Sequence, residues 1–592
     1  MIAVALAILF ATALAVVLSL SIHSTPALWL AVYVVGVAEV VVMIEVLSLF
    51  RAVTALNVLL AELALLAVAV VVFSRRRGLI VWQPLRRFPL RQMLDGQPLL
   101  RLLLVVVVGA FVYEFALAVF TPPNNWDSMA YHLSRAAAWY HHHGVAYVDA
   151  HTERENAYQP NAEILVLYTF LFAHADTFAS TWQWLAGVAS LPAIYLVARR
   201  LSFDRQQALF AALLFATLSQ TALQATTTQN DLVAASLVVA CVAFLATSER
   251  HRLWLAAVAL GAAIGTKLTV AFALPALIVF AALLVPRREW LRLACLTAVM
   301  TAVFGSFGYI LNVAHTGSPL GATSATAAFQ QHSWIGRLGT LGLIGARIVV
   351  DPVVRDEDLA YLGPLGAVLV VPVIVLTLRR YLRGNATRLE AATAAALPLY
   401  AIALAYSYRF NPWIGRFMLT PAALVAALFG SVYHHRRYTL AVTALAIATL
   451  TTTVVFNHAK PSGIGDGPSI WTMTRAQAQA VQRPVMRPVL ATVAACVPAH
   501  AAIGYDIGDN DWDYPLFGDR LTRRIVRLER SALFQEADRL KLGWVLIARR
   551  GATKPPSEWL ARTFREPGLI LLQRNPASPD VANRVARCEA IS

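Results

Sequence analysis

The chain has 592 residues, of which 58% are hydrophobic and only 14% are charged. Soluble domains average about 25% charged residues, so this composition excludes an ordinary water-soluble protein and indicates one mostly embedded in a membrane. The net charge of +16 does not indicate a nucleic-acid partner, because the Lys and Arg residues cluster between apolar runs, as they do in polytopic membrane proteins.

The apolar runs are long enough to cross a bilayer, which takes about 20 residues in a helix. The first run has no basic segment before it and is longer than the core of a typical signal peptide, so we expect a retained span. We expect about fourteen spans, at residues 2–21, 27–50, 53–73, 99–120, 178–198, 206–224, 230–247, 253–266, 268–285, 289–313, 361–378, 389–408, 414–433 and 437–457.

The connections between these runs alternate between basic ones and ones poor in Lys and Arg. The positive-inside rule places the basic connections in the cytoplasm, so loops 121–177 and 314–360 and both termini fall outside. The basic residues of the cytoplasmic connections are Arg75, Arg76, Arg77, Arg86, Arg87, Arg91, Arg199, Arg200, Arg205, Arg250, Arg252, Arg287, Arg288, Arg379, Arg380, Arg383, Arg436 and Arg437.

The two long outside loops differ in composition. Residues 160–174 begin with proline and contain Glu163, which predicts a half-buried helix returning from the first loop. Residues 314–360 are rich in Gly, Ser and Thr, and loops of this length are usually functional or disordered. Because this second loop neighbours the first, we favour a mobile lid on the acceptor side.

The segment 121–160 is too polar for lipid and too varied for a linker. Pro122 and Pro123 end the preceding helix, because proline lacks an N–H and clashes with the turn before it. Asn124 and Asn125 can cap a new helix. Apolar residues then recur every three or four positions, which predicts a helix lying in the membrane interface with its polar face toward water. That polar face carries Asp127, Ser128, His132 and Arg135.

These features resemble the first exterior loop of the GT-C superfamily of membrane glycosyltransferases, which includes protein O-mannosyltransferases and aminoarabinose transferases. The resemblance rests on an apolar span, two prolines, the motif N-N-W-D-S-x-x-Y-H-L-x-R and a Q-P pair opening the next helix. It is strongest over residues 122–160, extends to about residue 455 and is weak before residue 99. It implies a polytopic α-helical GT-C fold and a sugar donor carried on polyprenyl phosphate.

Asp127 is the candidate base. In the superfamily, the aspartate just beyond the first core span is the catalytic acid/base or lies beside it. Asp127 is the residue at the matching position. A carboxylate at a helix start is stabilised by the amide dipoles, so it should stay ionised and able to accept a proton. The alternative is a simple helix cap, and the two roles are compatible.

Cations are needed to hold the departing phosphate. Lys267 and Arg416 lie within apolar runs, where a charge costs about 2.5–3.5 kcal/mol on insertion scales, so we expect them to bind phosphate rather than only reach the surface. Arg135 and Arg409 are further candidates. Asp231 opens a span on the same side, where it could orient Lys267, contact the acceptor or cap its own helix.

Other residues of the first loop are candidates for substrate binding. These are Tyr131 and His132 on the predicted helix and Glu155 later in the loop. In the aminoarabinose transferases an acidic and a basic residue precede the matching proline, whereas Tyr158 and Gln159 stand there in this chain. This departure removes one phosphate contact that the resemblance implies, and it leaves the donor sugar open.

The sequence has no evident metal or cofactor site. His141, His142 and His143 are consecutive, so on a helix their side chains fan out, whereas zinc takes about four convergent ligands. A solvated turn is the better interpretation of this run. Some GT-C enzymes use a divalent cation, and no pattern here predicts a site for one.

The tail changes character after a Gly/Pro-rich linker at residues 458–475. AAIGYDI, RRIVRL, WVLIARR and LILLQR predict buried strands, and SALFQEADRLKLG and SEWLARTF predict helices, which together indicate a small α/β domain. No G-x-G-x-x-G follows the first strand, so we predict no nucleotide site. Cys241 and Cys295 lie in spans, and Cys496 and Cys588 are predicted to pair, since the periplasm permits disulfides.

The sequence thus predicts three parts: accessory helices at residues 1–98, a GT-C catalytic module at 99–457 and a periplasmic α/β domain at 458–592. We expect an inner-membrane glycosyltransferase that moves a sugar from a polyprenyl-phosphate carrier to a periplasmic glycan, lipid or protein hydroxyl. The alternatives are a GT-C-like ligase or polymerase with diphosphate-linked donors, and a lipid-carrier transporter or flippase. Neither the sugar nor the acceptor follows from the sequence.

Overall fold

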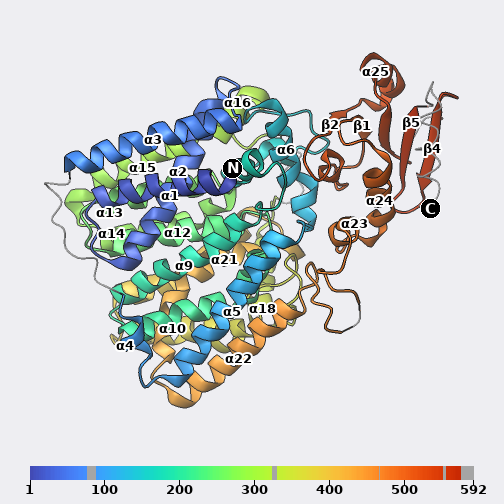
Figure 1. Ribbon diagram of the computed structural model, residues 1–592. Helices are drawn as coiled ribbons and strands as arrows, with labels where there is room; N and C mark the ends of the chain where they lie inside the picture. The colour runs from blue at the N-terminus through green and yellow to red at the C-terminus, as the bar shows by residue number, and fades with distance from the viewer. Residues whose placement is uncertain (77–87, 323–329, 466, 551–554, 575–592) are drawn as a thin grey trace.

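The computed structural model describes residues 1–76, 88–322, 330–465, 467–550 and 555–574 (Figure 1). Arg77, Arg86, Arg87 and Cys588 lie outside these residues, so the predicted Cys496–Cys588 pair stays a prediction. The chain forms a large bundle of helices, with a smaller C-terminal part that contains a sheet at one end (Figure 1).

Helix covers every apolar run predicted as a span. The bounds are α1 Ile2–Ser19, α2 Thr25–Ser48, α3 Ala55–Arg76, α4 Leu90–Leu94, α5 Pro98–Phe120, α9 Thr181–Arg200, α10 Arg205–Ala216, α11 Ser219–Gln224, α12 Asp231–Ala246, α13 Arg252–Ile264, η2 Leu268–Ala273, α14 Leu274–Leu284, η3 Arg287–Glu289, α15 Trp290–Phe304, α16 Phe307–Thr316, η4 Gly366–Val370, α19 Val371–Leu382, α20 Arg388–Ser407, η5 Pro412–Met418, α21 Leu419–Val425, η6 Ala426–Val432 and α22 Arg436–Val455.

Fewer of these helices are long enough to form a span. Among the described residues, seven helical stretches are long and apolar enough to cross a membrane, one of them made of η5, α21 and η6 together, or eight if α15 and α16, which meet at 61°, form one bent span. Shorter helices fill the interior: every residue of α12 is buried, as expected for a helix that is apolar on all sides. The total of fourteen spans therefore stays a prediction.

The two loops form the helices η1 Ser128–His132, α6 Leu133–His142, α7 Arg154–Ala157, α8 Asn161–Ala173 and α18 Trp334–Val349. The prediction of a half-buried helix at 160–174 is wrong, because α8 is buried on all faces. Its acid, Glu163, can be buried because His132 contacts it. The loop at 314–360 contains the 16-residue helix α18 in its described part, and a lid role for this loop stays a prediction.

The helix after Pro123 also differs from its prediction. It starts with a π-helical turn, and Ser128, His132 and Arg135 are buried instead of facing water. Asn124 and Asn125 do not cap it. The Asn125 amide donates to Glu357 Oε1 at 2.5 Å, and the Asn124 amide donates to two backbone carbonyls of the later chain. These asparagines of the first loop therefore form hydrogen bonds with later segments of the chain instead of capping the helix.

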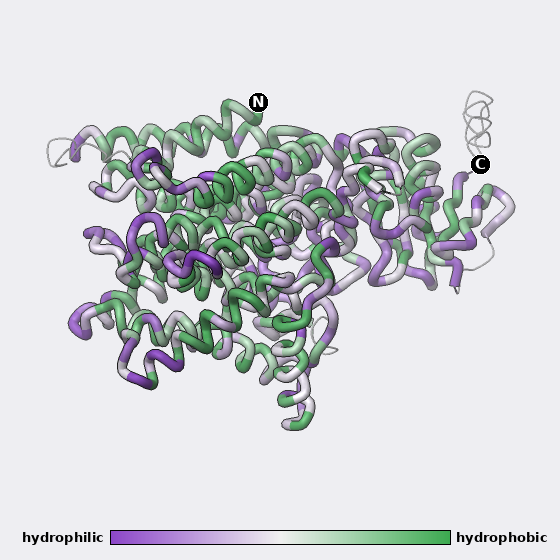
Figure 2. The backbone as a smooth tube through the Cα atoms, turned by 90° about the horizontal axis from the view of Figure 1, so that it is seen from below, coloured by the Kyte–Doolittle hydropathy of each residue, from purple (hydrophilic) through white to green (hydrophobic). Residues whose placement is uncertain are grey.

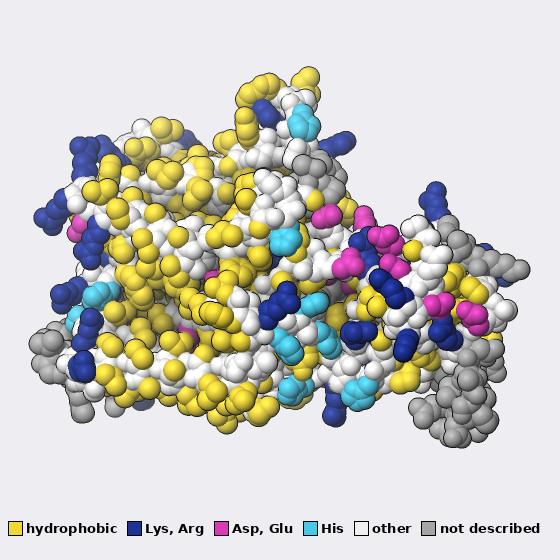
Figure 3. Space-filling view, turned by 90° about the horizontal axis from the view of Figure 1, so that it is seen from above, with side chains coloured by type: hydrophobic (Ala, Val, Ile, Leu, Met, Phe, Trp, Pro, Cys, Tyr) yellow, Lys and Arg dark blue, Asp and Glu magenta, His cyan; other side chains and the backbone are white. Residues whose placement is uncertain are grey.

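Polar residues mark the two ends of the bundle. Figure 2 shows hydrophilic residues gathered at the ends of the helices and in the tail, with apolar residues along the helices between them. Figure 3 shows Lys and Arg side chains along the end of the bundle that points away from the tail, and a broad hydrophobic surface beside them. This distribution is typical of a polytopic membrane protein.

The tail contains α23 Arg475–Gln479, η7 Pro484–Met486, α24 Arg487–Cys496, β1 Ala502–Asp506, η8 Tyr514–Phe517, β2 Arg524–Arg527, η9 Arg530–Ala532, α25 Leu533–Arg539, β3 Trp544–Ala548, β4 Trp559–Phe564 and β5 Leu569–Arg574. The strand order is β2-β1-β3-β5-β4. Strand β1 is parallel to β2 and β3, whereas β5 is antiparallel to β3 and β4.

The four predicted strands are confirmed, but the helix predicted at SEWLARTF is wrong. This segment is the edge strand β4, which pairs along its whole length with β5. The Pro567-Gly568 pair between the two strands is a turn signal that favours this hairpin over a helix.

The first loop and the tail pack together around a shared hydrophobic core. Met129, Leu133 and Phe170 of the loop lie in one hydrophobic cluster with Trp512 and Tyr514 of the tail. An ion pair and a hydrogen bond reinforce this contact: Asp176 contacts Arg475 and accepts a hydrogen bond from the Tyr514 hydroxyl at 2.9 Å. The tail therefore holds the first loop in place.

Helices α13 and α15 cross closely enough to require glycine. A Cβ at Gly261 would collide with the Met300 carbonyl, and a Cβ at Gly305 would lie 2.7 Å from the Gly261 carbonyl. The side-chain amide of Asn161 bridges the two helices by donating to the Ala262 and Phe304 carbonyls. This crossing fixes the end of α13, immediately before the segment that carries Lys267.

Candidate active site

A cavity of about 470 Å³ lies where the first loop meets the ends of later helices. Its lining residues are Trp126, Asp127, Tyr131, Arg154, Ala157, Tyr158, Gln159, Asn230, Thr266, Lys267, Leu268, Thr269, Leu320, Asp358, Tyr408, Asn411, Trp413, Arg416, Phe417 and Asn510. We call it the inner cavity. Acidic, basic and aromatic side chains meet in it, although they come from segments up to about 290 positions apart in sequence.

Asp127 lies at the start of η1 and faces two arginines and one tyrosine, which come from three segments. Arg416 Nη2 contacts its Oδ2 atom, the Tyr131 hydroxyl donates to the same oxygen at 2.9 Å, and Arg154 Nη1 lies 3.8 Å from Oδ1. The carboxylate makes no capping bond, so it is free of that structural role. Burial alone would raise the pKa of Asp127, but Arg416, His132 and Arg154 outweigh burial and lower it. The side chain is therefore ionised at neutral pH.

Arg416 connects three carboxylates. Besides Asp127, its Nη1 atom lies 3.3 Å from Asp358 Oδ1, and its Nε atom lies 4.0 Å from Asp231 Oδ2. The short helix η5 positions it: Asn411 caps the start of η5 by accepting from the Trp413 N–H at 3.1 Å. A planar guanidinium suits such multiple oxygen contacts, and it suits phosphate equally well.

Lys267 supplies a second cation to the inner cavity. Its Nζ atom lies 2.6 Å from Asp231 Oδ1 and 4.9 Å from the centre of the Phe417 ring. Asp231 is the buried first residue of α12 and does not line the cavity. The acid therefore lies behind Lys267 and orients the ammonium, one of the roles predicted for it.

The other predicted residues divide into two groups. Tyr131, Tyr158 and Gln159 line the inner cavity. His132, Arg135, Glu155 and Arg409 do not line it.

Behind the cavity, His132 contacts Glu163, and Arg135 donates to the Tyr158 carbonyl at 3.0 Å. Both side chains are buried, so they support the cavity wall. Arg409 is exposed.

Two charged residues of the inner cavity, Arg154 and Asp358, were not predicted from the sequence. Arg154 follows the first carboxylate of the pair at Glu153 and Glu155, and Asp358 follows two other acids in a loop that lacks any motif. Burial and the neighbouring Glu357 raise the pKa of Asp358. The acidic run at 356–358 was the available signal for it. Asp127 and Asp358 thus share Arg416 while their pKa values shift in opposite directions, an arrangement common among acid and base pairs.

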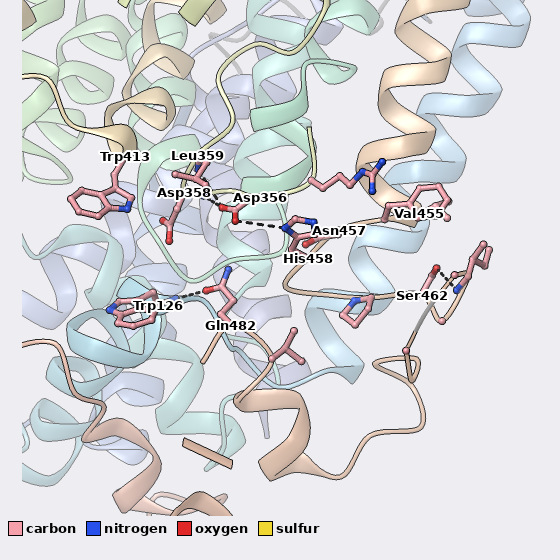
Figure 4. Close-up of a pocket in the computed structure, with 18 residues that line it drawn as sticks. Trp126, Asp356, Asp358, Leu359, Trp413, Val455, Asn457, His458, Ser462 and Gln482 are labelled. Atoms are coloured by element: carbon pink, nitrogen blue, oxygen red, sulfur yellow. Dashed lines mark hydrogen bonds and ion pairs between the residues drawn. The ribbon is translucent and has the colours of Figure 1, made fainter. Parts of the chain in front are cut away.

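A second cavity of about 780 Å³ adjoins the first, and we call it the outer cavity (Figure 4). Trp126, Asp358 and Trp413 line both cavities. Figure 4 shows these residues along one side and His458 and Ser462 along the other. Asp356 Oδ2 lies 3.7 Å from His458 Nδ1 across part of this wall. The outer cavity is therefore polar and borders the charged cluster at Asp358.

Neither cavity has a metal-ligand set among the described residues. The run at His141–His143 does not converge: His143 ends α6 in the left-handed conformation, while the His141 ring stacks on Phe517 of the tail. The interpretation of this run as a solvated turn fits His142 and His143, which are exposed, but it is wrong for His141, which packs against Phe517. Within the described ranges, one group could hold a metal ion, His151 with Glu155 and Asp513.

Comparisons with known proteins agree with this architecture. Residues 162–308 match the family described as dolichyl-phosphate-mannose-protein mannosyltransferase. The structure is similar to that of ArnT from Cupriavidus metallidurans bound to undecaprenyl phosphate, with a TM-score of 0.53 and 12% identity, over 80% of this chain and 98% of that one. For the apo state of ArnT the TM-score is 0.51, the identity 14% and the coverage the same. A comparison with curated proteins finds no match.

Proposed function

We propose that this chain, a membrane protein with the fold of the GT-C glycosyltransferases, transfers a sugar from a polyprenyl-phosphate carrier to an acceptor hydroxyl. The observation that carries this proposal is the contact between Asp127 and Arg416 in a cavity that also contains Lys267. The base and the phosphate-binding cations that such a transfer needs are thus within one space. By the positive-inside rule, this cavity opens on the periplasmic side of a bacterial inner membrane.

Arg416 and Lys267 bind the phosphate of the carrier. Both cations contact carboxylates in the free protein, and each has further donors that can reach a phosphate oxygen. The similar ArnT structure contains undecaprenyl phosphate, and we infer a carrier of the same class here.

Asp127 is the base of the reaction. It takes the proton of the acceptor hydroxyl, whose oxygen attacks the anomeric carbon as the bond to the phosphate oxygen breaks. The electron pair of that bond leaves with the phosphate, where Arg416 and Lys267 stabilise it. Attack opposite the leaving group inverts the anomeric configuration.

Arg416 also couples donor binding to the strength of the base. In the free protein it lowers the pKa of Asp127, which makes the carboxylate a weak proton acceptor. A bound phosphate adds negative charge beside Arg416 and competes for its donors. The pKa of Asp127 then rises toward the range in which a general base is effective, so the base becomes active when the carrier is bound.

The outer cavity receives the acceptor. Trp126 and Trp413 offer flat apolar faces, which suit sugar rings, and Asp358 lies at the junction with the inner cavity. An acceptor seated there directs a hydroxyl toward Asp127. Its class is a glycan, a lipid or a protein of the cell envelope.

The test begins with a deletion strain, in which mass spectrometry identifies the sugar-phosphate lipid that accumulates. The purified protein is then incubated with that lipid and an extract of the unmodified acceptor. We expect release of polyprenyl monophosphate together with a glycosylated acceptor. Release of polyprenyl diphosphate would instead identify a ligase or polymerase, and movement of the lipid across vesicles without transfer would identify a transporter.

A further inference from the structure

A second charged cluster lies on the other side of α7, between the first loop and the tail. His151 Nδ1 lies 3.1 Å from Glu155 Oε1 and 3.5 Å from Asp513 Oδ2. The three side chains are almost completely buried, with 1–2% of each exposed. None of them lines the inner or the outer cavity. The cluster is therefore separate from the catalytic site.

The cluster lacks a partner for its central atoms. Among the described residues, neither His151 Nδ1 nor Glu155 Oε1 has a hydrogen-bond partner of acceptable geometry. His151 Nε2 lies 3.2 Å from the Asp511 carbonyl oxygen, which can only accept, so Nε2 carries a proton. In the neutral ring, Nδ1 then presents a lone pair toward two carboxylates. Three electron-rich atoms facing one another in a buried space are stabilised by a metal ion or a proton between them, and the separations fit a metal ion.

We propose that His151, Glu155 and Asp513 form a binding site for a divalent transition-metal ion such as Zn²⁺. Bonds of about 2.0–2.2 Å from zinc to nitrogen and oxygen place neighbouring ligands of a tetrahedron about 3.3 Å apart, close to the two measured separations. Two carboxylates and a neutral imidazole have a net charge of −2, which the ion neutralises. A water molecule or a further oxygen completes the coordination.

The surroundings of the three ligands also match those of a metal site. Ligating histidines usually donate their second N–H to a carbonyl or carboxylate, as His151 does to Asp511. The second oxygen of Asp513 accepts a hydrogen bond from Ser134 on α6, which orients that carboxylate. Both partners are independent of the proposed glycosyl transfer.

The ion would join the first loop to the tail. His151 and Glu155 flank the start of α7, and Asp513 directly precedes η8 of the tail. Arg154, which faces Asp127, lies between the two loop ligands in sequence. A metal ion here acts as a structural cross-link that positions Arg154 at the active site.

The experiment measures zinc in the purified full-length protein after removal of any affinity tag. We expect about one zinc ion per chain, and at least about tenfold less retained zinc in H151N and in D513N, since each removes a ligand. The matched control is H500N, which removes an exposed histidine of the tail and should keep the metal. Equal zinc content in wild type and H151N would overturn the proposal.

Two measurements on the unmodified protein keep the test valid if the variants do not fold. A chelator should lower the melting temperature, and added zinc should restore it; no change with the chelator would overturn the proposal. X-ray absorption at the zinc edge should reveal one imidazole with oxygen ligands, and scattering from sulfur or several imidazoles would contradict it. Neither measurement requires glycosyl transfer, so this inference and the proposed function can fail separately.

Discussion

The two charged clusters on either side of α7 differ in what they face. The first, with Asp127, Arg154 and Arg416, lines a cavity of about 470 Å³ and contains cations that match its acids. The second, with His151 and Glu155, is sealed, and its acids exceed its bases. An open and balanced cluster can exchange its partners with a substrate, whereas a sealed cluster with an excess of acids favours a bound proton or the metal ion proposed above. Burial and charge balance therefore distinguish the cluster proposed for catalysis from the cluster proposed for structural support.

Consecutive residues of α7 serve the two clusters. Arg154 lies near Asp127, and Glu155 lies near His151. Neighbouring side chains on a helix point in different directions, about 100° apart, so one short turn can reach both clusters. A change on one side of α7 is thus transmitted to the other through four residues of backbone.

The strongest effect on activity should come from removing the proposed base, Asp127. Replacing Asp127 with Asn removes the proposed base and should lower kcat by about 10²–10⁴-fold, the usual contribution of general base catalysis. The measurement is the initial rate of transfer from the sugar-phosphate lipid. D149N is the matched control, because Asp149 is an exposed acid of the same loop. Full activity in D127N would remove the basis of the comparison.

The next effect concerns the cation. R416Q should lower kcat/KM by about 10²–10³-fold, because the developing phosphate charge loses its main donor. It should also weaken inhibition by free polyprenyl phosphate, measured as the concentration for half inhibition. R409Q provides the control, since Arg409 is exposed and outside both cavities. Equal inhibition of R416Q and wild type would show that Arg416 does not contact the phosphate.

A smaller effect is expected where the two cavities meet. W413A should raise KM for the acceptor about tenfold, which corresponds to about 1.4 kcal/mol, and leave KM for the lipid donor nearly unchanged. W471A is the control, because Trp471 is similarly exposed but lines neither cavity. A change in donor KM alone would assign the outer cavity to the donor instead.

The smallest effect concerns the dependence of stability on pH. The pKa of Asp127 is lower in the folded protein than in the unfolded chain, so its stabilisation is complete above the unfolded value, about 4. That stabilisation is lost as the pH falls below 4 toward the folded value. The melting temperature of wild type should therefore fall more between about pH 6 and pH 3 than that of D127N. Parallel curves for the two proteins would contradict the ion pair.

Much of the architecture could be predicted because membrane insertion leaves a strong local signal. Apolar runs gave the positions of the helices, and the loop motif identified Asp127 as the residue to examine. Lys267 and Arg416 were predicted to bind phosphate because a charged residue in an apolar run is energetically costly. The structure brings all three residues into one cavity.

The remaining features depend on contacts that the local pattern does not contain. Asp358 and Asp513 reach their clusters through folding of distant segments, and neither lies in a motif. The segment SEWLARTF has a composition suited to a helix, yet pairing with β5 makes it a strand. The asparagines before Asp127 were predicted as caps, but tertiary hydrogen bonds occupy both amides. In each of these cases, contacts with residues distant in sequence determine the structure, and the local sequence does not show those contacts.

The glycine contact between α13 and α15 has a consequence for inherited or engineered variation. The two backbones lie so close at Gly261 and Gly305 that neither position has room for a Cβ atom, and α13 ends just before Lys267. Adding one methyl group there would displace the ammonium from its acid without altering any residue of the cavity. A harmful substitution in this protein can therefore lie at a helix crossing, outside the residues that line either cavity.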